Sequence, residues 1–286
     1  MKLFIMTILN GLTLAALYFL VASGFTLVFG VMRNVNLAHG SLFLLGAYVG
    51  FDVAEATGSW VLGAAGGFVA IAILGLLLQV CIFRFMEGQD LRQTLVTIGI
   101  SIILADVMLA VWGGVTYQFE IPDALYGVTR LPIIKVYTTY RLFILLIAVV
   151  IGLALWLFLD KTRVGMMIRA GVDDRDMLAA TGVNVHRVFA IVFTIGAGLA
   201  GFAGVVGGSA LSIAPGEDLR YLLASLVVVI VGGMGSVGGA ALGALLIGLA
   251  EQFGLAYSPT YGVVYTFIIM VLTLAFRPQG LLGRRA

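Results

Sequence analysis

The chain has 286 residues, of which 62% are hydrophobic and only 10% are charged, and its mean hydropathy is +1.14. A soluble domain is usually about 45–50% apolar and about 25% charged. No soluble fold has enough interior to bury this much apolar surface, so lipid must be the solvent for most of it. The composition excludes a cytosolic enzyme and a disordered chain. It predicts a single domain over residues 1–286 that is all-α, a polytopic bundle of transmembrane helices.

Several kinds of chemistry are also excluded by composition. The net charge is only +2 with no basic run, so nucleic acid is not an expected partner. The single cysteine, Cys81, can form no internal disulfide, and the two histidines are too far apart in sequence to suggest a metal site. The chain has no Gly-Lys-Ser/Thr of a P-loop. We therefore expect no cofactor and no ATPase site of its own, and any ATP must be bound by another polypeptide.

Membrane-spanning helices are predicted from the apolar stretches, since about 20 apolar residues are needed to cross a bilayer. These stretches cover 3–30, 40–57, 60–85, 94–113, 140–159, 188–210, 221–250 and 262–276. They predict about eight or nine spans. The first is too long for a signal peptide and shows no cleavage site, so we interpret it as a retained helix. Residues 87–92, 116–141, 160–187 and 215–220 are interpreted as polar connections.

Two stretches interrupt the apolar pattern. The first runs from Met32 to Gly40 and contains Asn34, Asn36 and His39, and the second has five glycines between Gly232 and Gly239. Each glycine costs a helix about 1 kcal/mol relative to alanine, so 221–250 is predicted to be two half-length helices that meet at an unwound turn. Unwound backbone persists at membrane depth only where protein or a water-filled cavity surrounds it. The polar groups of the first break therefore either contact a polar substrate or cap the freed backbone and hold two helices together.

Lysine and arginine near the span ends predict the orientation. Residues 160–187 contain Lys161, Arg163, Arg169, Arg175 and Arg187, so this loop is predicted to be cytoplasmic. Residues 117–136 then lie outside, as does the N-terminus if the first helix crosses once.

Two acidic side chains fall within or beside the apolar stretches. Asp106 stands alone in one of them, and is either functional or a hydrogen-bonding or snorkelling group. Glu251 is predicted to lie at the membrane interface, because its helix is expected to end there.

Within the 160–187 loop a short helix is predicted over 173–181. Gly171 is expected to interrupt the chain, Asp173 to cap the helix, and Gly182 to end it. Such a helix either docks onto a partner or is an ordinary loop helix tucked against the bundle.

Three motifs in order resemble one family. They are Asn36-Leu-Ala-His-Gly40 followed by Leu44-Leu-Gly-Ala-Tyr48, then Arg169-Ala-Gly with Ala179-Ala-Thr-Gly-Val-Asn184, and then Val231-Gly-Gly-Met-Gly-Ser-Val-Gly-Gly-Ala240. The chain resembles the permease subunit of branched-chain amino acid ABC importers, of the LivH type.

That resemblance implies a bacterial inner-membrane subunit with a set of partners. These would be a LivM-type permease or a second copy of the chain, two cytoplasmic ATPase subunits and a periplasmic solute-binding protein. It implies a substrate pathway at Asn34, Asn36, His39, Ser41, Gly232, Gly233, Gly235, Ser236 and Gly238. It implies ATPase coupling through Arg169, Asp173, Asp174, Met177, Ala180 and Gly182.

One departure leaves the substrate open. Many members of the family have Glu after the His-Gly pair, whereas this chain has Ser41. Urea, short amides and aromatic acids therefore stand as alternatives to branched-chain amino acids. A stand-alone secondary transporter is a further alternative, and a membrane enzyme is disfavoured because no catalytic cluster is visible.

Overall fold

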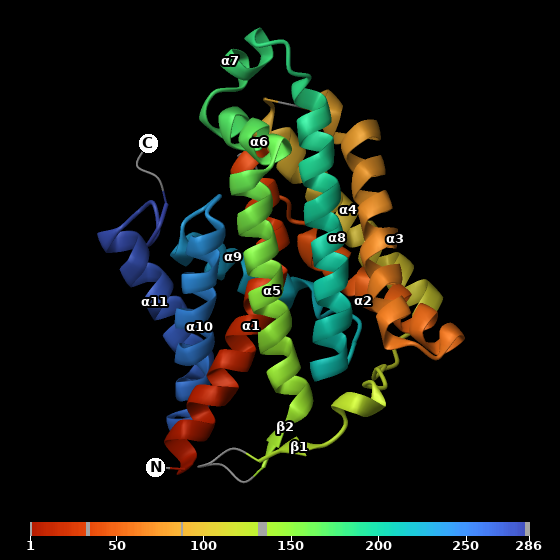
Figure 1. Ribbon diagram of the computed structural model, residues 1–286, viewed down its shortest axis with the longest axis vertical. Helices are drawn as coiled ribbons and strands as arrows, with labels where there is room; N and C mark the ends of the chain where they lie inside the picture. The colour runs from red at the N-terminus through yellow and green to blue at the C-terminus, as the bar shows by residue number, and fades with distance from the viewer. Residues whose placement is uncertain (1, 33–34, 87, 131–135, 284–286) are drawn as a thin grey trace.

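The computed structural model describes residues 2–32, 35–86, 88–130 and 136–283, and it is helical almost throughout (Figure 1). The α-helices are α1 (Lys2–Met32), α2 (His39–Thr57), α3 (Trp60–Cys81), α4 (Asp90–Trp112), α5 (Thr139–Lys161), α6 (Arg163–Asp173), α7 (Arg175–Ala180), α8 (Val185–Leu211), α9 (Asp218–Gly232), α10 (Val237–Tyr257) and α11 (Gly262–Phe276). Three 3₁₀ turns join them, η1 (Phe83–Met86), η2 (Asp123–Leu125) and η3 (Pro259–Tyr261). Strands β1 (Val128–Thr129) and β2 (Tyr137–Thr138) pair antiparallel in a small hairpin. The all-α prediction is confirmed.

Six described helices are long and apolar enough to cross a membrane, namely α1, α3, α4, α5, α8 and α10. They differ in their place in the bundle. The most apolar segments of α1 and α8 are 78% and 72% buried, whereas those of α4 and α5 are 11% and 17% buried. Helices α1 and α8 therefore form the centre, while α4 and α5 present apolar side chains to lipid.

Small residues allow the central helices to pack backbone against backbone. A Cβ atom added to Gly24 of α1 would collide with the carbonyl oxygen of Gly196 in α8. The same holds where Gly46 of α2 meets Gly201 of α8, and where Gly201 meets Gly67 of α3. Close contact of this kind is typical of helices that associate in a bilayer, where apolar burial drives no packing.

The two ends of the bundle are distinct (Figure 1). Helices α6 and α7 lie at one end, called here the α7 end, and the strands β1 and β2 lie at the other, called here the hairpin end. The N-terminus is at the hairpin end, where the Tyr137 hydroxyl donates to the Leu9 carbonyl at 2.9 Å. The tail after α11 reaches the α7 end, where Leu281 N–H donates to Val231 O and Leu282 N–H to Gly232 O, both at 2.9 Å.

Helix α2 begins inside the bundle rather than at its end. It runs parallel to α4, so that each of its residues lies beside the α4 residue numbered 60 higher. The Leu37 N–H bond to Thr97 Oγ1 and the Trp112 Nε1–H bond to Asp52 both show this offset. His39 is therefore level with residue 99, nine residues after the start of α4, or about 14 Å deep at 1.5 Å per residue.

Helix α9 begins at the same depth. A Cβ atom added to Gly40 would collide with the carbonyl oxygen of Asp218, the first residue of α9. From there α9 runs 15 residues to the α7 end. Its length of about 22 Å is too short to cross the hydrocarbon core, which is about 30 Å thick. The starts of α2 and α9 therefore meet deep within the bundle.

The structure corrects the prediction for 221–250. The unwound turn is confirmed, since Gly233 and Gly235 have φ angles of 109° and 79°. The second helix is not half-length, because α10 has 21 residues and continues to Tyr257. Glu251 consequently lies inside α10, and its prediction as a helix end is wrong.

Candidate functional site

The polar groups of the first break bond to neighbouring backbone. Asn36 Oδ1 accepts the Ala38 N–H at 3.1 Å, and His39 Nε2 donates to the Val21 carbonyl of α1 at 3.0 Å. His39 is 1% exposed, and its ring meets Phe25 edge-on at 5.2 Å between centroids. The His39 bond fastens the start of α2 to α1, whereas the Asn36 bond is local and holds the turn just before α2. Asn34 lies outside the described residues.

The second break ends in a capped helix. Ser236 Oγ accepts the Gly239 N–H at 3.0 Å and so satisfies one free donor at the start of α10. Gly235 contacts Gly30 at the end of α1, so the two breaks lie side by side. A Cβ on Gly238 would meet only Leu282, at 3.8 Å. Gly238 therefore needs to be glycine neither for a positive φ nor for close packing, whereas Gly235 needs to be glycine for both reasons.

Ser41 belongs to a polar group that the sequence did not reveal. Its hydroxyl donates to Asp218 Oδ2 at 2.9 Å and hydrogen-bonds the Ser101 hydroxyl of α4 at 2.8 Å. Asp218 was missed because residues 215–220 have the polar composition of a surface connection. The available signal is Pro215-Gly216 followed by Glu217, Asp218 and Arg220 at the start of an apolar helix.

Further charged groups lie close to Asp218. Arg220 Nη1 contacts Glu217 Oε2 at 3.1 Å, and Glu251 Oε2 accepts the hydroxyl proton of Tyr18 at 2.6 Å. Asp106 lies elsewhere, with its side chain exposed on α4. Helices α1, α2, α4, α9 and α10 thus bring hydroxyl, carboxylate and guanidinium groups together around the start of α9.

The predicted coupling segment forms two helices at the α7 end. Ile168 of α6 is 2% exposed and packs in a cluster with Leu27 of α1, Leu155 of α5 and Val188 of α8. Arg169 Nη1 contacts Asp160 Oδ1 of α5 at 2.8 Å. Helix α6 is thereby fixed to the bundle by apolar burial on one side and an ion pair on the other.

Helix α7 presents an exposed surface. Met177 is 65% exposed and Ala180 is also exposed, whereas Leu178 is buried beneath them against α6. Gly182 has a φ of 85° and ends the segment as predicted. Exposed apolar side chains on a helix that the bundle holds from below are suited to contact with a partner.

Two details of this segment differ from prediction. Gly171 does not interrupt the chain but lies within α6, where it faces Leu178. The cap of α7 is Asp174, whose Oδ1 accepts the Met177 N–H at 2.9 Å, and not Asp173, at which α6 ends. The predicted helix thus begins two residues later.

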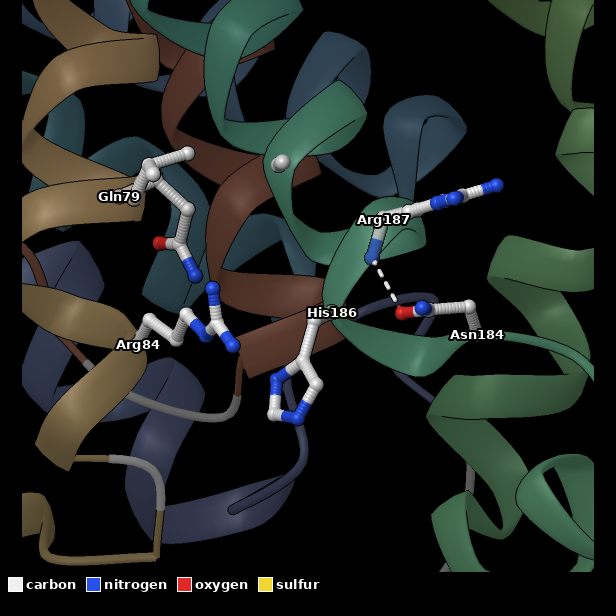
Figure 2. Close-up of a pocket in the computed structure, with 7 residues that line it drawn as sticks. Gln79, Arg84, Asn184, His186 and Arg187 are labelled. Carbon is white, nitrogen blue, oxygen red and sulfur yellow. Dashed lines mark hydrogen bonds between the residues drawn. The ribbon is translucent and has the colours of Figure 1, made fainter.

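A cavity of about 210 Å³ opens at the α7 end between the end of α3 and the start of α8. Figure 2 shows Arg84 and His186 pointing toward one another across it, with Gln79 beside Arg84. Asn184 Oδ1 accepts the Arg187 N–H at 3.1 Å and caps α8 on the far wall (Figure 2). In the part of the chain that the structure describes, no three His, Cys, Asp or Glu side chains gather as a metal site.

The bundle combines helices of membrane length with two helices, α2 and α9, that begin inside it, and exposed helical segments lie at one end. This architecture is that of a multi-pass membrane transport protein. Residues 7–274 match the family described as "Branched-chain amino acid transport system / permease component", and the chain belongs to that family. The resemblance found in the motifs is thus confirmed.

Three relatives illustrate the match. The chain is 32% identical to LivH, the high-affinity branched-chain amino acid transport system permease protein of Escherichia coli K12, over 98% of this chain and 96% of LivH. It is 29% identical to the corresponding protein BraD of Pseudomonas aeruginosa, with the same coverage. It is 26% identical to the E. coli permease protein LivM, over 94% of this chain and 68% of LivM. No solved structure matches the chain.

Proposed function

We propose that this chain is the LivH-type permease subunit of an ATP-driven ABC importer in the bacterial inner membrane, with branched-chain amino acids as substrates. The observation that carries the proposal is the match to LivH over nearly the full length of both chains. The permease would form half of a translocation pathway and would bind no ATP itself. ATP would be bound by two partner subunits, and substrate would be delivered by a periplasmic binding protein.

The second half of the pathway would come from a LivM-like subunit. Its support is that LivM itself is similar to this chain, which is expected if the two permeases arose from one fold and pair with each other. A pair made of two copies of this chain is the alternative. Purification of the tagged chain from its own cells distinguishes the two by the subunits that accompany it.

Coupling to ATP would act through α7. Closure of the ATPase dimer would press on the exposed surface at Met177 and Ala180, and α6 would transmit that movement because it is packed on α1, α5 and α8. A ligand shifts a conformational equilibrium only through contacts that differ between the two states. The contact between α7 and the ATPase supplies that difference.

The test is uptake by proteoliposomes that hold the permease pair and both ATPases. Radiolabelled leucine and loaded binding protein are added outside, and ATP is enclosed. Wild-type uptake should require ATP and every subunit, and valine and isoleucine should compete for it while urea, acetamide and benzoate should not. Uptake by this chain alone, driven by an ion gradient, would establish the secondary-transporter alternative. In that case the charged groups around Asp218 would be suitable for binding the coupling ion.

A pair of variants tests the coupling surface. Ala180→Arg places a long charged side chain in the α7 contact and should abolish stimulation of ATP hydrolysis by loaded binding protein. Ala124→Arg, at an exposed position of the opposite end, should change nothing. Stimulated hydrolysis at the wild-type level in Ala180→Arg would show that α7 is not the coupling helix.

A further inference from the structure

The polar group around the start of α9 lies near the middle of the membrane. Ser101 is the central residue of α4, with eleven helical residues on either side, so it lies about 16 Å from each end. Ser41 bonds to Ser101, and Asp218 bonds to Ser41. Tyr18, which bonds to Glu251, is also near the centre of its 31-residue helix.

Glu217 and Arg220, which flank Asp218 in the sequence at the start of α9, extend this cluster of polar groups toward Tyr18 of α1. Arg220 is paired with Glu217 at 3.1 Å on one side and lies within electrostatic range of Tyr18 on the other. Tyr18 in turn donates to Glu251 at 2.6 Å. The cluster therefore contains one guanidinium, three carboxylates and several hydroxyls.

The cluster is open to the outside of this chain. The side chain of Arg220 is 67% exposed and that of Glu217 is 37% exposed. Charged side chains at membrane depth are costly against lipid, and they almost always face a bundle interior or a water-filled cavity. The face that carries Arg220 must therefore border water or another subunit, which is where a translocation pathway between two permease subunits would run.

An apolar groove adjoins the charged cluster. It is lined by the Tyr18 and Tyr221 rings together with Leu17, Val21 and Phe43, and it encloses about 20 Å³. That volume takes no more than a methyl-sized group in this state. The groove nevertheless places apolar surface directly beside the guanidinium and the carboxylates.

We propose that Tyr18, Ser41, Glu217, Asp218, Arg220 and Glu251 form a transient binding site for the charged backbone groups of an amino acid in transit. This proposal rests on the proposed import function. Arg220 presents a planar fork of N–H donors that matches a carboxylate, which it binds through two parallel hydrogen bonds. The carboxylates bind the α-ammonium group, and the apolar groove receives the end of the side chain.

This arrangement specifies a substrate class. A molecule with adjacent positive and negative groups and an apolar branch satisfies both signs of charge and the groove. Urea satisfies neither charge, and a benzoate-like acid leaves the carboxylates without a cation. Only an α-amino acid uses every part of the cluster, since an unpaired charge left in such a site is penalised.

The first experiment compares Arg220→Gln and Arg220→Lys with the control Arg141→Gln, whose arginine is exposed at the hairpin end and bonds to Asn10. Leucine uptake, co-purification of all subunits and ATPase stimulation are measured in the complete proteoliposome system. Arg220→Gln should lower uptake at least about 30-fold, because the carboxylate of the amino acid in transit would lose its two parallel, charge-assisted hydrogen bonds. Its assembly and stimulated ATPase should be retained, Arg220→Lys should recover part of the uptake, and the control should match wild type.

The second experiment detects the ligand directly. A cysteine replaces Leu219, which is 59% exposed beside Arg220, in a Cys81→Ser background of the assembled complex. Millimolar leucine should slow labelling by a charged thiosulfonate reagent, and urea should not. The protection should vanish when Arg220→Gln is added, and a cysteine at Leu91, exposed at the start of α4, should show none.

Three outcomes would overturn the proposal. Wild-type uptake by Arg220→Gln would show that no carboxylate is bound there, and leucine without effect on labelling at 219 would show that the face is not on the pathway. Loss of the second permease subunit from Arg220→Gln would make Arg220 an assembly contact. Failure of the import function itself is recognised separately, since wild-type proteoliposomes would then show no ATP-dependent uptake.

Discussion

Gly30 and Gly235 meet so closely that a Cβ atom added to Gly30 would lie 2.9 Å from the Cα atom of Gly235. Gly30 lies two residues before the end of α1, and Gly235 lies in the turn between α9 and α10, more than 200 residues later. The contact joins the two interruptions of the apolar pattern at the α7 end. A change in the angle between α9 and α10 must therefore move the end of α1, so the pair is a direct mechanical link between the two halves of the chain.

The first prediction separates two glycines of the same turn. Gly235→Ala should impair folding and uptake, because its φ of 79° costs an L-residue about 1–2 kcal/mol and its Cβ would lie 3.0 Å from Gly30 Cα. Gly238→Ala should be tolerated, since its Cβ would meet only Leu282 at an ordinary distance. Thermal stability in detergent and leucine uptake are the measurements. Equal behaviour of the two variants would contradict the close approach at Gly235.

The second prediction concerns the meeting of α2 and α9. Gly40→Ala should abolish uptake, because the added methyl group collides with the Asp218 carbonyl and forces the start of α9 away from Ser41. Gly99→Ala is the matched control, since it lies at the same depth in α4 with open space around it. Alanine there should raise stability slightly, because it favours a helix over glycine by about 1 kcal/mol. An active Gly40→Ala protein would show that α2 and α9 are not held together in the transporting state.

The third prediction tests the α7 cap. Asp174→Ala removes the acceptor for the Met177 N–H and should cost the helix about 0.5–2 kcal/mol. This is too little to unfold the bundle but enough to fray a helix of six residues. Coupling, measured as leucine transported per ATP hydrolysed, should fall moderately, and Asp174→Asn should restore it because asparagine caps equally well. An unaltered ratio in Asp174→Ala would mean that the helix is held by its partner rather than by its cap.

Sequence reasoning found the parts of this fold that local composition determines. The helices expected in the apolar stretches, the glycine turn after Gly232 and the stop at Gly182 are confirmed, because hydrophobicity and positive φ are encoded in neighbouring residues. Sequence reasoning failed where the position of a residue depends on a contact with another residue that is distant in the sequence. Glu251 lies inside α10, where Tyr18 of α1, distant in the sequence, donates to its carboxylate. The charge of Asp218 suggests a polar connection, whereas its bond to Ser41 and the contact of its carbonyl with Gly40 show its depth.

The last prediction concerns the orientation in the membrane. The basic residues of 160–187 predict that the α7 end is cytoplasmic, and the fold places the tail after α11 at that same end. Cysteine is introduced in a Cys81→Ser background at Met177, exposed on α7, or at Ala124, exposed near the hairpin end. A membrane-impermeant maleimide added to intact cells should label the cysteine at 124 but not the one at 177, which should react only after the membrane is opened. The reverse pattern would invert the topology, and it would place α7 where no cytoplasmic ATPase could reach it.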